Sequence, residues 1–166
     1  MIEPVLVKNF YSSDMIALMQ KQMDVLKREA KFQDNDRFHR LEYHNHPLFK
    51  ALHELQIQKA KDLFQADIKP TYCFASMYFE GEGYCPKHTD RPQCKYTVDL
   101  CVNQVKPWSF FAECGDRQYE FLMEPGDAIL LSGTDHPHWR DKIQPDNFCD
   151  LVFFHYVDQD FQGEMN

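Results

Sequence analysis

The sequence lacks several features that would assign it to a large class of proteins. It has no apolar run near the roughly 20 residues of a membrane-spanning helix, and its start, MIEPVLVKNF, lacks the basic residues and long apolar stretch of a secretory signal. We therefore expect a cytoplasmic location and no membrane partner. Positive charge is also scarce, since 18 Lys and Arg residues against 26 Asp and Glu residues give a net charge of −8. Because phosphate backbones attract cations, this balance disfavours a nucleic-acid partner.

Cysteine and glycine patterns argue against two further classes of site, disulfides and dinucleotide-binding loops. No two of the six cysteines are spaced as CxxC, and a reducing compartment disfavours disulfides, so we expect reduced thiols, with cysteine-bound zinc as the alternative. Gly81 and Gly83 follow a predicted strand, but Pro86 occupies the third position of a dinucleotide-binding loop and no helix follows. A nucleotide-binding function is therefore disfavoured. The cysteines are Cys73, Cys85, Cys94, Cys101, Cys114 and Cys149.

The composition predicts a single domain with a substantial core. The chain has 166 residues, of which 43% are hydrophobic and 14% aromatic, and no segment has the composition of a linker. Residues 1–68 are expected to be mostly helical and to pack on the rest. One amphipathic helix is predicted over about residues 13–31, a polar loop over 34–46, and a second helical segment over 48–63 after Pro47.

From residue 69 onward the hydrophobic period changes from that of a helix to that of a strand. Short runs rich in aromatic and β-branched residues alternate with Gly, Pro, Asp and Asn, without a helical pattern between them. About eight antiparallel strands over residues 69–158 indicate a jelly-roll core. The predicted fold is α+β but mainly β: a double-stranded β-helix (jelly roll) with two N-terminal supporting helices. The predicted strands are 72–79, 96–102, 108–113, 118–123, 128–131 and 148–157.

Metal-ligating side chains occur in two parts of the predicted jelly roll. His88 and Asp90 are two residues apart, so on a strand both side chains would project from one face. A turn and a buried strand later deliver the chain to His136 and His138. Two histidines and one carboxylate form the facial triad of non-haem Fe(II) sites. We predict His88, Asp90 and His138 as the ligands, although the spacing leaves His136 as an alternative distal ligand.

These motifs resemble those of the Fe(II)/2-oxoglutarate-dependent dioxygenases, especially the prolyl-4-hydroxylase-like branch. The resemblance covers about residues 70–157 and rests on the runs Tyr78–Asp90, Gly126–Ser132 and His138–Arg140. It implies that Tyr78 hydrogen-bonds 2-oxoglutarate and that Tyr84 lies near the mouth of the site. Arg91 and Trp108 lie in segments that we expect at the substrate entrance. No catalytic residue is predicted beyond the iron ligands.

The sequence departs from the family at the anchor for the far carboxylate of 2-oxoglutarate. The family usually has an Arg or Lys about ten residues after the distal histidine, whereas Cys149 and its neighbours occupy that position here. Since a buried carboxylate needs a partner, we predict Arg140, which shares a strand face with His138, and consider Lys95 and Arg91 as alternatives. His155 has the same strand parity as Cys149 and is expected to donate a hydrogen bond into the barrel.

The resemblance also implies a reaction and its cofactors. With Fe(II) as the bound cofactor, 2-oxoglutarate and O₂ would be consumed in hydroxylating a C–H bond of an amino acid, a peptidyl residue or a small metabolite. Succinate and CO₂ would be released, with ascorbate as an optional reductant. Asp90 occupies the position that halogenases of the superfamily leave to a small residue, which favours hydroxylation. Two alternatives remain open: a non-catalytic, cupin-like metal-binding module, and a zinc hydrolase that uses the same ligands.

Overall fold

Two antiparallel sheets form the framework of the chain. The computed structural model describes residues 2–33, 38–79 and 81–166, so the start of the predicted 34–46 loop lies outside the described residues. The larger sheet has seven strands in the order β1-β9-β6-β11-β4-β3-β2. These strands are β1 (Val5–Val7), β9 (Ala128–Ser132), β6 (Tyr96–Gln104), β11 (Cys149–Asp158), β4 (Ile68–Tyr78), β3 (Arg40–His44) and β2 (Lys31–Gln33).

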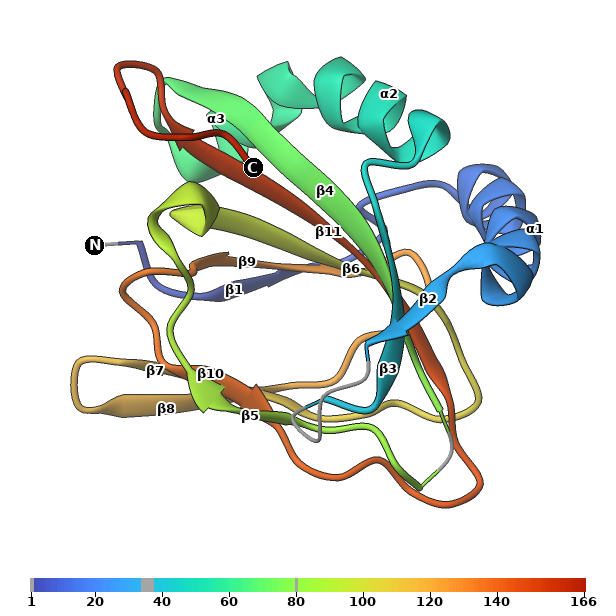
Figure 1. Cartoon of the computed structure of the whole chain (residues 1–166). Helices are drawn as coiled ribbons and strands as arrows, with labels where there is room; N and C mark the ends of the chain where they lie inside the picture. The colour runs from blue at the N-terminus through green and yellow to red at the C-terminus, as the bar shows by residue number, and fades with distance from the viewer. Residues whose placement is uncertain (1, 34–37, 80) are drawn as a thin grey trace.

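The smaller sheet lies opposite the larger one and completes the jelly roll. Its order is β5-β10-β7-β8, and it faces the β9-β6-β11-β4 part of the larger sheet (Figure 1). The eight strands of these two groups confirm the predicted fold class. The strands of the smaller sheet are β5 (Cys85–His88), β10 (His138–Arg140), β7 (Phe110–Cys114) and β8 (Arg117–Phe121).

Three helices cover the outer face of the larger sheet (Figure 1). Helix α1 (Ser13–Glu29) is capped by the Ser12 side chain and ends before the predicted residue 31, because the chain turns into β2 there. The second predicted helical segment is two helices, α2 (Pro47–Leu55) and α3 (Ile57–Phe64). They separate at Gln56, whose side-chain amide donates to the Tyr156 hydroxyl of β11 at 2.8 Å.

The first third of the chain also contributes strands, which the prediction of a mostly helical segment missed. Strand β3 pairs with β4 in a register that places Arg40 opposite Tyr78. The pattern of β3 is too short and polar to identify a strand locally, since its stability comes from pairing with β4. This pairing brings residues from the N-terminal third to the edge of the cavity described below.

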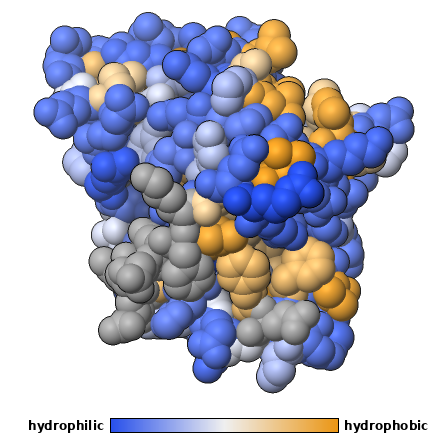
Figure 2. All heavy atoms as spheres, turned by 45° about the vertical axis from the view of Figure 1, so that its right-hand side comes forward, coloured by the Kyte–Doolittle hydropathy of each residue, from blue (hydrophilic) through white to orange (hydrophobic). Residues whose placement is uncertain are grey.

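The core has two main parts, one between the helices and the larger sheet and one between the two sheets. The six cysteines are all free thiols, and five of them are buried. No helix within the described ranges has the length and apolar character needed to cross a bilayer. On the face seen in Figure 2, hydrophilic side chains predominate and hydrophobic ones gather in smaller patches.

Candidate metal centre

The His88 and Asp90 side chains approach His138 at one end of the smaller sheet. His88 is the last residue of β5 and lies directly opposite His138 of β10 in the antiparallel pair. Asp90 follows the end of β5, so the predicted continuous strand through both residues is not formed. Its position is set instead by its backbone N–H, which donates to the Gly133 carbonyl at 2.8 Å.

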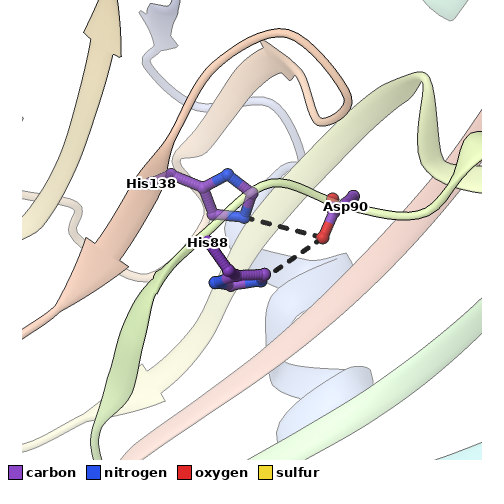
Figure 3. A group of neighbouring side chains, drawn as sticks. All are labelled: His88, Asp90 and His138. Atoms are coloured by element: carbon purple, nitrogen blue, oxygen red, sulfur yellow. Dashed lines mark ion pairs between the residues drawn. The ribbon is translucent and has the colours of Figure 1, made fainter.

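The three side chains direct one donor atom each toward a common point. Asp90 Oδ1 lies 3.4 Å from His88 Nε2 and 3.7 Å from His138 Nε2, as Figure 3 shows. The Nδ1 atoms of His88 and His138 lie 2.7 and 2.9 Å from the carbonyls of Pro86 and His136. A carbonyl only accepts, so both Nδ1 atoms carry hydrogen and each Nε2 can offer its lone pair to a metal ion. The donor set therefore fits a two-histidine, one-carboxylate metal site.

The electrostatics of this cluster favour a cation. Burial opposes protonation of His88, but its interactions with Asp90, Cys85 and the Pro86 carbonyl together outweigh burial and raise the pKa of His88 to about 10. Burial raises the pKa of Asp90, yet the hydrogen bond from His88 and the other nearby histidines lower it overall. Burial lowers the pKa of His138. Without a metal, the Asp90 carboxylate therefore stabilises a protonated, positively charged His88. This positive charge lies where a metal ion would bind.

The neighbouring His136 makes a different set of contacts. Its Nδ1 accepts the backbone N–H of Ser132 at 3.1 Å, and its side chain is completely buried away from the triad. Of the two candidate distal histidines, only His138 therefore lies within reach of His88 and Asp90.

Gly133 is required by the close packing behind Asp90. A Cβ atom at this position would lie 2.3 Å from Asp90 Oδ2 and 2.3 Å from the Cys94 carbonyl oxygen. We expect Gly133→Ala to lower the free energy of unfolding by about 1–3 kcal/mol and to weaken metal binding, because Asp90 must move. Denaturant unfolding and metal titration measure the two effects.

Gly115→Ala is the matched control for that variant. The added methyl group meets no atom within 4 Å, but the positive φ of 58° makes the substitution cost about 1–2 kcal/mol. It should therefore reduce stability without changing metal affinity. An unchanged metal affinity in Gly133→Ala would show that Asp90 is not held in place as described.

A cavity of about 410 Å³ opens beside the three metal-ligating residues. Aromatic rings form one wall, in which Phe74 stacks on Phe153 with ring centroids 4.8 Å apart and Tyr72 lies 4.7 Å from His155. The polar lining includes three arginines and two carboxylates. These charged residues are Arg40, Arg91, Arg140, Asp90 and Asp99.

Arg140 lines this cavity on the same strand face as His138, as parity predicts, but its guanidinium has other partners. It donates to Asp99 Oδ2 at 2.8 Å and to the Trp108 carbonyl at 2.9 Å, and both Arg140 and Asp99 are buried. Burial raises the pKa of Asp99, and Arg140 opposes that rise. The charge of Arg140 is therefore largely balanced within the protein, which weakens its case as the anchor for 2-oxoglutarate.

Arg40 is a second buried guanidinium in the cavity wall, and the sequence reasoning missed it. One terminal nitrogen donates to the Tyr78 hydroxyl at 2.5 Å, and the other forms an ion pair with Glu42. Its Nε has no partner among the described residues. Since Arg40 precedes the predicted core by nearly thirty residues, only the β3–β4 pairing reveals its proximity to Tyr78.

His155 lies in the cavity wall, as the strand parity predicts. Its Nδ1 is 3.0 Å from Thr97 Oγ1, which also lies 3.2 Å from the Cys94 carbonyl oxygen. With the hydroxyl hydrogen on the Cys94 carbonyl, His155 Nε2 carries a lone pair, and with that hydrogen on Nδ1, Nε2 carries a hydrogen. Burial lowers the pKa of His155 to about 4. The donation of a hydrogen bond by His155 stays a prediction.

The three residues predicted to contact substrate are separated by the fold. Arg91 lines the cavity and its Nε donates to the Tyr72 hydroxyl at 3.2 Å. Trp108 is buried behind the lining, packs on Tyr78 at 5.0 Å between ring centroids, and supplies the carbonyl that holds Arg140. Tyr84 lines a shallower surface hollow with Lys87 and not this cavity. Of the three, only Arg91 lines the cavity, and the substrate contacts of all three stay predictions.

Known proteins resemble this chain in fold but not in sequence. No protein-family model matches the sequence, and no curated protein matches it either. Solved structures do match. HygX from Streptomyces hygroscopicus, determined with nickel and 2-oxoglutarate bound, is 10% identical with a TM-score of 0.76, and the match covers 96% of this chain and 84% of HygX.

Two further structures extend this comparison. The non-haem alpha-ketoglutarate-dependent carbocyclase SnoK from nogalamycin biosynthesis is 11% identical with a TM-score of 0.78, covering 98% of this chain and 82% of SnoK. A Pseudomonas putida prolyl-4-hydroxylase is 14% identical with a TM-score of 0.71, covering 93% of this chain and 92% of that protein. This chain therefore has the jelly-roll fold of the 2-oxoglutarate-dependent Fe(II) oxygenases, including that of a prolyl-4-hydroxylase.

Proposed function

We propose that this protein is an Fe(II)- and 2-oxoglutarate-dependent dioxygenase that hydroxylates a C–H bond of a small molecule, an amino acid or a peptidyl residue. The observation that carries the proposal is the convergence of His88 Nε2, His138 Nε2 and Asp90 Oδ1 beside a cavity with a buried cationic wall. The likeness of the fold to oxygenases solved with nickel and 2-oxoglutarate supports it.

His88, Asp90 and His138 would hold the iron, and the carbonyls of Pro86 and His136 keep both imidazoles in the ligating tautomer. Bound Fe(II) would supply the chemistry of this class, in which 2-oxoglutarate and O₂ are converted to succinate and CO₂ while one oxygen atom enters a substrate C–H bond as hydroxyl. With Asp90 among the ligands, no position is left to a halide, so hydroxylation is the favoured outcome. The protein's contribution is to bind and orient the reactants.

The charges around the cavity suit a dianion once a divalent metal is bound. Among the described residues, the three arginines in the lining are balanced by Asp90, Asp99 and Glu42, which pairs with Arg40. A divalent ion then leaves two positive charges, and 2-oxoglutarate brings two negative ones. This balance explains how an acidic chain can take up a dianionic co-substrate.

We assign the anchor for the far carboxylate of 2-oxoglutarate to Arg40 and Tyr78. Arg40 retains an unpartnered Nε within the described part of the chain, and it donates to the Tyr78 oxygen, which leaves the phenolic hydrogen available. A carboxylate can accept from both groups, with one hydrogen bond that is charge-assisted. Tyr78 then keeps the role that the family resemblance implies, while Arg40 takes the place predicted for Arg140.

Arg40→Met should weaken 2-oxoglutarate binding by about 10- to 100-fold, since a hydrogen bond to a charged group contributes about 1.5–3 kcal/mol. Anaerobic titration of 2-oxoglutarate into the Fe(II)-loaded chain measures this affinity. Lys95→Met is the matched control, because Lys95 pairs with Asp158 outside the cavity. If Arg40→Met leaves the affinity for 2-oxoglutarate unchanged and Arg91→Met lowers it, then Arg91 and not Arg40 binds the far carboxylate.

The size and lining of the cavity support a small substrate group. About 410 Å³ must hold both 2-oxoglutarate and the reacting part of the substrate. The stacked wall of Phe74 and Phe153 favours an apolar or planar group, and Arg91 at the cavity can pair with an anionic one. HygX has been solved with hygromycin B bound, and a prolyl-4-hydroxylase shares the fold, so both small-molecule and peptidyl substrates are to be screened.

The decisive experiment is anaerobic addition of Fe(II) and 2-oxoglutarate to the full chain. A visible metal-to-ligand charge-transfer band is expected, followed on admission of O₂ by succinate formation that depends on iron. His88→Ala should abolish both signals, whereas His136→Asn, which retains an acceptor near the position of Nδ1, should preserve them. Absence of the band would favour a cupin-like binding module, and activity supported by zinc without succinate would favour a hydrolase.

A further inference from the structure

A second group of metal-ligating side chains lies next to the first and shares one residue with it. Cys94 Sγ, His155 Nε2 and an Asp90 carboxylate oxygen lie within 4.8 Å of one another. Asp90 and Cys94 come from one short segment that includes the 3₁₀ helix η1 (Pro92–Cys94), and His155 comes from the adjacent β11. Cys94 and His155 are each at most 3% exposed, and Asp90 is partly buried.

The hydrogen bonds around His155 leave its Nε2 as a ligand without a partner. In the tautomer that binds a metal through Nε2, His155 Nδ1–H donates to Thr97 Oγ1, and the Thr97 hydroxyl donates to the Cys94 carbonyl. His155 Nε2 then carries a buried lone pair, and no group in the described part of the chain donates to it. An unpaired buried acceptor is costly, and a bound cation would remove that cost.

Cys94 lies at the end of a short chain of hydrogen bonds. Arg91 Nε donates to the Tyr72 hydroxyl at 3.2 Å, which occupies an oxygen lone pair of the phenol. That hydroxyl lies 3.0 Å from Cys94 Sγ, and either atom can donate the hydrogen between them. Burial and the Asp90 carboxylate raise the pKa of Cys94 to about 11, so a metal ion that binds the sulfur must displace its proton.

We propose that Cys94, His155 and Asp90 form a second metal site, selective for a thiophilic divalent ion such as Zn²⁺, which competes with the His88–Asp90–His138 site for Asp90. Sulfur, imidazole and carboxylate together are typical zinc ligands, whereas two imidazoles and a carboxylate suit Fe(II). Tetrahedral zinc, with bonds of about 2.0–2.3 Å, brings its ligands to about 3.5 Å from one another, so these side chains must close inward by about 1 Å.

Competition follows from the sharing of Asp90. Two divalent cations that share one carboxylate would lie close together and repel each other strongly. The Asp90 carboxylate and one thiolate offset only half of their combined charge, and the nearby Asp99 is already paired with Arg140. We therefore expect one ion per chain at a time. If the proposed oxygenase activity holds, zinc at this site would inhibit it by withdrawing Asp90 from the iron ligands.

Cobalt(II) is the probe, because cobalt bound to a thiolate has an intense near-ultraviolet charge-transfer band that nitrogen and oxygen ligands do not produce. The full-length His88→Ala/His138→Ala double variant lacks both histidines of the first site and should bind one equivalent of cobalt with this sulfur band. Adding Cys94→Ser should abolish the band. Adding Cys85→Ser is the matched control, since Cys85 also lines the cavity but lies at His88, 3.8 Å from Nδ1, and the band should remain.

The outcomes separate this proposal from the proposed function. No sulfur band in the folded double variant, a band that survives Cys94→Ser, or one that is lost in Cys85→Ser would overturn the second site without affecting the iron assignment. Circular dichroism checks the fold, and His138→Gln replaces the double variant if that variant unfolds. Equilibrium dialysis of the wild type with excess Zn²⁺ should retain one ion, and retention of two ions would overturn the competition.

Discussion

Replacing His138 by alanine should reduce Fe(II) affinity by more than about 100-fold and abolish succinate formation. Loss of a group that merely supports a ligand costs about 10- to 100-fold in metal affinity, and His138 would supply a ligand itself. Its Nε2 lies 3.7 Å from Asp90 Oδ1, and its ring centroid is 4.4 Å from that of His88. Anaerobic competition between the protein and a coloured chelator for Fe(II) measures the change.

The control for this variant must separate metal loss from damage to the fold. His138 is buried and packs on Phe110, with ring centroids 5.7 Å apart, so His138→Ala also leaves a cavity. His138→Gln keeps most of the volume and should lose iron affinity to a similar degree while its unfolding curve stays closer to that of the wild type. Iron affinity within tenfold of the wild type in both variants would show that His138 is not a ligand.

Replacing Arg140 by methionine should lower the free energy of unfolding by about 3–5 kcal/mol, the cost of removing one partner of a buried ion pair. Asp99 is completely buried, and its Oδ2 has Arg140 as its partner at 2.8 Å. Its Oδ1 has no hydrogen-bond partner among the residues that the structure describes. Without the guanidinium, this carboxylate would be left unpaired in the interior. Urea denaturation of the two proteins measures the difference.

Two further variants test whether charge pairing is the cause. Asp99→Asn combined with Arg140→Met should recover part of the lost stability, because no unpaired charge remains. Lys87→Met removes one partner of the partly exposed pair with Glu113 and should cost less than about 1 kcal/mol. If Arg140→Met is as stable as Lys87→Met and instead loses 2-oxoglutarate binding, then Arg140 is the anchor and the assignment to Arg40 is wrong.

The results expected for His138→Ala and Arg140→Met assign different roles to two buried polar residues of the cavity. His138 acts on a bound metal, whereas Arg140 acts on Asp99 and so on the stability of the wall that surrounds the metal. Arg40 combines a structural role with a binding role. It donates a hydrogen bond to Tyr78, and its Nε has no partner in the described part of the chain and can bind a ligand. The cavity therefore contains one arginine with a structural role, Arg140, and one proposed to bind the co-substrate, Arg40. A sequence motif does not distinguish the two.

Local patterns in the sequence were sufficient to predict the jelly roll and to identify His88, Asp90 and the pair His136 and His138 as candidate ligands. Alternating hydrophobic runs predicted the long strands β4, β6 and β11, because strand periodicity depends on which face of each segment is buried. The strand parity of His138 and Arg140 likewise expresses local backbone geometry, and both residues line the cavity. The two-residue spacing predicted that His88 and Asp90 lie close together, although Asp90 lies beyond the end of β5 and is positioned by its hydrogen bond to Gly133.

Only the tertiary structure decided which groups meet across the chain. The register of β5 against β10 selects His138 over His136, and the pairing of β3 with β4 brings Arg40 to Tyr78. The burial of Asp99 beside Arg140 assigns that arginine a structural partner. Hydrogen-bond partners, ion pairs and shared ligands depend on contacts between residues tens of positions apart. Residue spacing contains no information about such contacts until the sheets have formed.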